Sequence, residues 1–257
     1  MKRLLSTVCV LGLLGFAAAQ MALADPEMEL VSGSDVILWD GTTLSCYNGS
    51  FVACTVFGAT ETTASGGGAT QVTIKAGNFN GWILNTSTGD SYSPTCSGTG
   101  VCEDQNDVNT LASGNANLET FFGDTGFAPV GAAGLMLTES ASDLAGTTAS
   151  PGTATATAYA YTGALGFSST GAPSLPGAWG PLSLTGHGAV ALSAGPVNTT
   201  APTAPYDLTA EFTLTPGPGS YNVTETIATV PEPTNAILLG SLLLLGATAV
   251  RKRLRKA

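Results

Sequence analysis

The chain has 257 residues, with 18 Asp and Glu, 8 Lys and Arg, and one His. Because seven basic residues lie at the two ends, residues 25–230 hold 17 acidic side chains against Lys75 alone, a net charge of −16 with His neutral. A domain this acidic repels nucleic acid, whose binding depends on Lys and Arg. It also lacks Arg, and most hydrolases and transferases need a cationic group or a His base, so composition argues against them.

The N-terminus has the three parts of a secretory signal peptide. Lys2 and Arg3 supply a basic start, Leu4 to Ala19 is apolar, and Ala22-Leu23-Ala24 has the small residues of a cleavage site. We therefore expect residues 1–24 to be a signal peptide and the mature chain to begin at Asp25. An uncleaved N-terminal helix is the alternative.

Four cysteines remain after removal of this segment: Cys46, Cys54, Cys96 and Cys102. An even number of cysteines in an exported chain predicts disulfide bonds. The short spacings favour two local bonds, Cys46–Cys54 and Cys96–Cys102, although three connectivities are open. A zinc site is the rival interpretation, but the close C-x2-C pair typical of zinc sites is missing.

The mature chain reads as short apolar or alternating runs separated by turn residues. Asn48-Gly49 and Asn80-Gly81 are the strongest hairpin signals, because type I′ turns need positive φ at both central residues. The expected strands are Val36–Trp39, Leu44–Tyr47, Phe51–Phe57, Gln71–Lys75, Trp82–Asn85, Leu135–Thr138, Thr153–Tyr161, Leu182–Leu192, Tyr206–Thr215 and Tyr221–Thr229.

Between these strands we expect loops at 61–70, 87–109 and 163–181, and a short helical turn at Leu118–Phe122. No long 3.6-residue period and no repeat of fixed length is present, which argues against a helical bundle, a propeller or a solenoid. The predicted fold class is all-β: a single β-sandwich-like domain over residues 25–229.

Candidate chemistry within this domain is sparse. Asp104 and Asp107 lie in the densest acidic cluster, where oxygen ligands could bind Ca²⁺, but the glycine and closing glutamate of an EF-hand are missing and a solvated acidic loop explains the same residues. His187 stands between two glycines without a recognisable nucleophile motif. We therefore predict no catalytic residues, no cofactor other than a candidate Ca²⁺, and no other metal site.

Residues 230–257 combine three devices. Pro231-Glu232-Pro233 holds a carboxylate in extended backbone, since each proline fixes φ and disfavours helix before it. The 17 residues from Thr234 to Val250 are uncharged and would span about 25 Å as a helix, close to the thickness of a bilayer core. The basic residues that follow hold their end in the cytoplasm: Arg251, Lys252, Arg253, Arg255 and Lys256.

This tripartite tail resembles the PEP-CTERM sorting signal of Gram-negative bacteria. The resemblance covers Pro231-Glu232-Pro233, the apolar run and the basic end, about a tenth of the chain. It implies recognition by exosortase, a membrane-embedded cysteine protease-like enzyme, with processing near Pro-Glu-Pro and delivery to the cell surface. An ordinary C-terminal membrane anchor is the alternative.

We therefore expect an exported, non-enzymatic protein of the cell surface or extracellular matrix. Its expected partners are an exosortase-like enzyme and, transiently, the inner membrane, with exopolysaccharide as a candidate and nucleic acid excluded. A glycan- or Ca²⁺-binding surface module is the second hypothesis; exposed Trp39, Trp82 or Trp179 around a groove would favour it. A carboxylate-based hydrolase is the remote alternative.

Overall fold

The structure is a computed structural model that describes residues 26–66, 69–91, 103–112, 114–127, 134–162, 165–200 and 206–230. These residues form fifteen strands and one 3-10 turn, η1 (Cys54–Val56), and no α-helix. The strands are β1 (Glu27–Ser32), β2 (Asp35–Trp39), β3 (Leu44–Asn48), β4 (Phe51–Val52), β5 (Thr60–Gly66), β6 (Ala69–Phe79), β7 (Trp82–Ser91), β8 (Glu103–Ala112), β9 (Leu118–Phe127), β10 (Gly134–Leu144), β11 (Gly152–Tyr161), β12 (Ala178–Gly186), β13 (Gly188–Thr200), β14 (Tyr206–Leu214) and β15 (Tyr221–Val230). The all-β prediction is confirmed.

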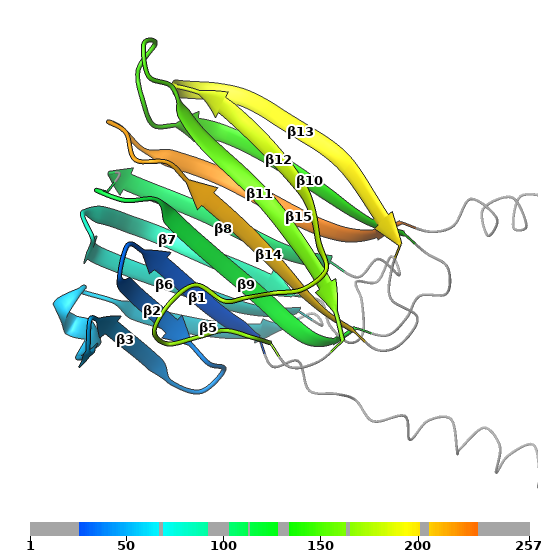
Figure 1. Ribbon diagram of the computed structural model, residues 1–257, viewed down its shortest axis with the longest axis horizontal. Helices are drawn as coiled ribbons and strands as arrows, with labels where there is room; N and C mark the ends of the chain where they lie inside the picture. The colour runs from blue at the N-terminus through cyan, green and yellow to red at the C-terminus, as the bar shows by residue number, and fades with distance from the viewer. Residues whose placement is uncertain are drawn as a thin grey trace, which may run out of the picture.

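The strands form two antiparallel sheets. One has eight strands in the order β12-β11-β14-β9-β1-β2-β3-β4, and the other has seven in the order β13-β10-β15-β8-β7-β6-β5. The sheets lie face to face, with β14 near β8 and β15, and β9 near β7 and β8 (Figure 1). Their inner faces share one hydrophobic core, so the predicted β-sandwich-like architecture is confirmed.

Alternating residues explain why these segments pack as they do. In β11, Ala154, Ala156 and Ala158 are fully buried, while the threonines between them are only half-buried. Successive side chains of a strand point to opposite faces, so the alanines face the core. A close approach occurs at Gly89 of β7, where an added Cβ would lie 1.9 Å from the ring of Phe122 in β9. Only glycine leaves room for that ring.

The two sides of the sandwich are closed differently. His187 is the single residue between β12 and β13, which belong to different sheets, and both strands lie together at one edge of the molecule (Figure 1). Each of these edge strands contains a proline, Pro181 or Pro196, which has no N–H to offer a further strand. At the other side, the edge strand β4 has only two residues. These features discourage edge-to-edge pairing.

Both hairpin signals form turns. Asn80 has φ 50° and Gly81 has φ 88°, as a type I′ turn between β6 and β7 requires. The Asn80 side-chain amide also donates to the Ser32 carbonyl oxygen at 3.1 Å and thereby fixes this turn to the turn between β1 and β2. Gly49 has φ 65° between β3 and β4.

Several local predictions are wrong. Residues 87–109 are not one loop: β7 continues to Ser91, and β8 begins at Glu103. Leu118–Phe122 is not helical but opens the central strand β9. The return strand predicted at Phe51–Phe57 ends at Val52, because the chain then turns into η1. β1 and β5 were not predicted. The predicted signal peptide, Cys96, Cys102 and the C-terminal tail lie outside the described residues.

Candidate functional site

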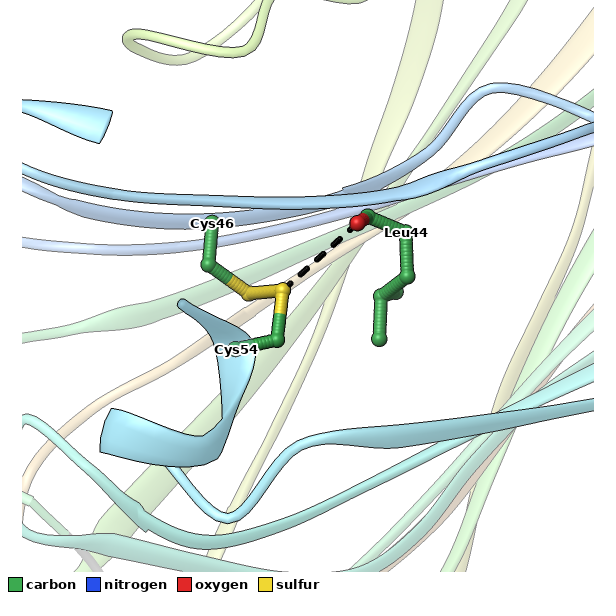
Figure 2. Close-up of a disulfide and its surroundings, with 3 residues drawn as sticks. All are labelled: Leu44, Cys46 and Cys54. Carbon is green, nitrogen blue, oxygen red and sulfur yellow. Dashed lines mark hydrogen bonds between the residues drawn. A yellow bond between two sulfur atoms is a disulfide. The ribbon is translucent and has the colours of Figure 1, made fainter. Parts of the chain in front are cut away.

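The predicted bond between Cys46 and Cys54 is present. Their Cα atoms lie 5.2 Å apart, and the bond ties the turn η1 to β3 (Figure 2). The Cys54 Sγ lies 3.6 Å from the Leu44 carbonyl oxygen. Since a disulfide sulfur carries no proton, we treat this approach as a packing contact. The tip held by this bond exposes Phe51, whose ring stands edge-on to that of Tyr47.

The two candidate Ca²⁺ ligands lie in β8 and not in a loop. Asp104 pairs in register with Ser91 of β7, and Asp107 pairs with Thr88. Within the described part of the chain, no three His, Cys, Asp or Glu side chains are grouped so that they could hold a metal ion.

Asp107 instead lines a shallow polar groove on the outer face of the seven-stranded sheet. The groove has a volume of about 360 Å³ and is lined by Gln71, Asn85, Thr86, Thr88, Asp90, Asp107, Val108, Asn109, Asn222 and Thr224. Gln71 Nε2 donates to Asp90 Oδ1 at 2.8 Å, and Asn85 Nδ2 donates to Asn109 Oδ1 at 3.2 Å. Burial, together with the nearby charge of Asp107, raises the pKa of Asp90, while the Gln71 hydrogen bond opposes the rise.

No tryptophan lines this groove. Trp82 is fully buried in the core, where its Nε1 donates to the Ala116 carbonyl oxygen at 2.9 Å. Trp39 is also buried, although its edge borders a smaller hollow of about 240 Å³ near Thr63 and Thr70. Trp179 is half-buried against the core. The three rings therefore do not form the exposed platform that the glycan-binding hypothesis asked for.

His187 lies on an exposed corner between β12 and β13. Its Nε2 is 3.2 Å from Thr148 Oγ1, a contact in which either atom can donate, depending on the tautomer. The corner belongs to the β12–β13 edge of the sandwich, whereas the polar groove lies over β6, β7, β8 and β15.

The least expected feature is a polar row between the sheets. Asn106 of β8, Glu225 of β15 and Glu139 of β10 are consecutive partners in register, and each is at most 2% exposed. They occupy inward positions, because their alternate neighbours Val108, Val223 and Leu137 belong to the core. Burial raises the pKa of Glu139 from its ordinary 4.5 to about 8.

The acceptors of this row outnumber its donors. Asn106 Nδ2 donates across the sandwich to the hydroxyl of Thr120 at 3.0 Å and to its carbonyl oxygen at 3.3 Å. Asn106 Oδ1 and both carboxyl oxygens of Glu139 have no hydrogen-bond partner among the described residues. Buried glutamates are normally paired, so the Glu139 carboxyl requires a bound proton or a cation.

A second buried carboxyl lies on the outside of the eight-stranded sheet. Glu29 of β1 is fully buried beneath the segment 165–177, which crosses in front of β1 and β9 (Figure 1). The Ser168 backbone N–H donates to Glu29 Oε2 at 2.9 Å. Burial, with smaller contributions from Glu27 and Glu119, raises the pKa of Glu29 to about 8 even though the Ser168 hydrogen bond lowers it.

Sequence reasoning missed the buried Glu139 and Glu225, although the alternation within their strands contains a signal. Leu135, Leu137 and Ala141 alternate as core residues of β10, and Glu139 takes the inward position between them. In β15, Val223 and Ile227 flank Glu225 in the same way. An acidic residue in phase with core positions is the pattern that would have identified them.

No protein-family model matches the chain, and no curated protein is significantly similar to it. Within the described residues, no helix has the length and apolar character needed to cross a membrane.

Proposed function

We propose that the chain is an exported, non-enzymatic protein of the cell surface or extracellular matrix, sorted by an exosortase-like enzyme. The observation that carries this proposal is the ordered tail: Pro231-Glu232-Pro233, an uncharged apolar run to Val250, and a basic end. The last strand of the sandwich, β15, ends at Val230, so the recognition segment follows the folded domain directly. The Cys46–Cys54 bond fits an oxidising compartment outside the cytoplasm.

The tail has a physical order that suits processing. An extended segment between two prolines exposes backbone that a helix would hide, so an enzyme can bind it. The apolar run would place that segment at the outer boundary of the inner membrane. The basic end would stop translocation, because moving its charges through hydrocarbon costs about 2.5–3.5 kcal/mol per residue on insertion scales.

Two altered proteins separate sorting from simple anchoring. Replacing Pro231, Glu232 and Pro233 by Ala should leave the protein uncut in the inner membrane of a host that has exosortase. Deleting residues 251–257 should weaken membrane retention even in a host that lacks it. Normal processing of the triple-alanine variant would contradict recognition at Pro-Glu-Pro.

The groove favours a second function, weak glycan binding. Amide and carboxylate side chains such as Gln71 and Asp90 form the hydrogen bonds that sugar hydroxyls require, and they line one hollow across four strands. Binding to neutral glycans that Gln71→Ala abolishes and Thr62→Ala on the exposed edge strand preserves would establish this function. Release of reducing sugar by the wild-type protein, lost in Asp90→Asn, would contradict the non-enzymatic proposal.

A further inference from the structure

The same reactive dipeptide stands at two turns of the sandwich. Asparagine is followed by glycine at Asn48-Gly49, between β3 and β4, and at Asn80-Gly81, between β6 and β7. This pair is prone to spontaneous deamidation, because a glycine has no side chain to keep its backbone nitrogen away from the asparagine amide. The two turns therefore differ only in what the fold places around them.

The reaction needs no enzyme and no redox partner. The glycine nitrogen loses its proton to base and attacks the asparagine Cγ, so that a new C–N bond closes a five-membered imide. The bond from Cγ to the side-chain nitrogen breaks, and this nitrogen leaves as ammonia. Water then opens the imide at one of its two carbonyls and gives aspartate or isoaspartate. Both the side-chain amide and the glycine nitrogen must be free to meet.

Both groups are free at Asn48-Gly49. The two residues are exposed. Among the described residues, the Asn48 side chain has no hydrogen-bond partner and the Gly49 N–H donates no hydrogen bond. The Asn48 backbone N–H donates to the Ser50 carbonyl oxygen at 2.9 Å, which closes the turn without engaging either reacting group. No atom lies within 4 Å of the place that a Cβ on Gly49 would take, so the turn has room to rearrange.

Both groups are held at Asn80-Gly81. The Asn80 Nδ2 donates to the carbonyl oxygen of Ser32 at 3.1 Å and to its Oγ at 3.2 Å. The Gly81 N–H donates to Asn78 Oδ1 at 3.2 Å. Asn115 closes the turn from outside, because its N–H donates to the Asn80 carbonyl oxygen at 3.0 Å and its Nδ2 lies 3.0 Å from the place of a Cβ on Gly81. Attack at this turn requires these bonds to break first.

We propose that Asn48 is a site of spontaneous deamidation, whereas the fold protects the identical dipeptide at Asn80. The product places a carboxylate directly opposite Asp35, which is the partner of Asn48 in the register of β2 and β3. Like charges opposite each other on antiparallel strands destabilise the pair. The modified turn remains tied to the fold, because it lies between Cys46 and Cys54 and their bond is untouched by the reaction.

The test incubates full-length protein in detergent at pH 8 and follows the two turns by peptide mapping with mass spectrometry and isoaspartate detection. We expect residue 48 to convert at least about tenfold faster than residue 80, since reaction at Asn80 must first break three hydrogen bonds. In urea, with the disulfide intact, the two positions should convert at similar rates. Asn48→Gln should remove the isoaspartate of the folded protein, and the matched control Asn198→Gln, at an exposed asparagine followed by threonine, should leave it unchanged.

Two results would overturn the proposal. One is equal conversion of residues 48 and 80 in the folded protein, which would mean that the contacts of Asn80 protect nothing. The other is retention of both amides in the folded protein while both are lost in urea, which would mean that the fold protects Asn48 as well. The effect on β2 and β3 is measured separately: Asn48→Asp should melt below wild type at pH 8, and Asp35→Asn should reduce this difference. An equal melting temperature would contradict the repulsion.

Discussion

Glu139 and Glu29 share a pKa of about 8 but differ in what covers them. Glu139 lies between the two sheets and has no described hydrogen-bond partner. Glu29 lies on the outer face of β1 and accepts a hydrogen bond from the Ser168 N–H. Its cover is the segment 165–177, which packs through Phe167 and Leu175 against a small cluster of Val31, Val36 and Phe121.

The two covers determine how water reaches each carboxyl when it ionises. Water can reach Glu29 when one surface segment lifts, a local opening that leaves both sheets intact. Water can reach Glu139 only when the sheets separate or β10 moves from β15, so its ionisation is coupled to the whole sandwich. Within residues 25–230 the only basic residue is Lys75, which is exposed on β6, so a bound proton neutralises each carboxyl instead.

The largest expected effect is the loss of stability of the wild-type protein between pH 5 and pH 9. Both glutamates bind a proton more tightly when folded, and each should remove about 1.4 kcal/mol per pH unit over the titrating range. Urea unfolding at a series of pH values measures the sum, a loss of several kcal/mol. A flat profile would mean that neither carboxyl is neutral in the folded protein.

Removing the disulfide tests whether stability elsewhere is independent of these carboxyls. Replacing Cys46 and Cys54 by Ser opens a loop with a sequence separation of 8 and should cost about 2–3 kcal/mol in the chain-entropy model. The bond lies on β3, in the sheet opposite β10, whereas Tyr47 next to Cys46 packs against the same small cluster as Phe167 and Leu175. The part of the pH slope that Glu139 contributes should therefore be unchanged. A changed slope in the same unfolding series would show unexpected coupling.

Phe167→Ala tests the cover of Glu29, the less protected of the two carboxyls. The Phe167 ring lies 6.3 Å from that of Phe121, and its loss should loosen the cover of Glu29. We expect a cost of about 1–2 kcal/mol, less than for a fully buried aromatic, and a fall in the pKa of Glu29 toward its ordinary value. Faster amide exchange near Ser168, with unchanged exchange in β10, would confirm a local opening.

How far the sequence could predict these features depends on how local their causes are. The turns at Asn48-Gly49 and Asn80-Gly81 were predictable because two residues determine the backbone conformation. β8 was not, since Asn106 and Thr110 take inward positions that the alternation rule assigns to apolar residues. β9 was misread as a helical turn because Leu118, Phe121 and Phe122 also fit a 3.6-residue period, and only pairing with β1 and β14 decides between the two.

The features of the candidate site also differ in how far the sequence could predict them. The tail motif and the Cys46–Cys54 bond depend on short spacings that the sequence displays directly. The buried row depends on three strands whose residues are far apart in the chain, 106, 139 and 225, and on a register that the sequence does not encode locally. The polar groove likewise appears only when β6, β7, β8 and β15 lie side by side.

The smallest expected effect is that of Asp90→Asn in the groove. Asp90 is half-buried and its pKa is raised, so a neutral amide at this position removes an unfavourable charge near Asp107. We expect a stability change within about 0.5 kcal/mol, favourable above neutral pH. Thermal unfolding at pH 6 and pH 9 measures it, and a large loss at both values would assign the carboxylate a structural role.

The proposed sorting route is tested most directly by the intact mass of wild-type protein isolated from a host that has exosortase. We expect a mature chain that starts at Asp25 and ends near Pro231-Glu232-Pro233, without the apolar run and the basic residues 251–257. A mass that retains the C-terminus through Ala257 would contradict the sorting proposal and leave the tail as a membrane anchor.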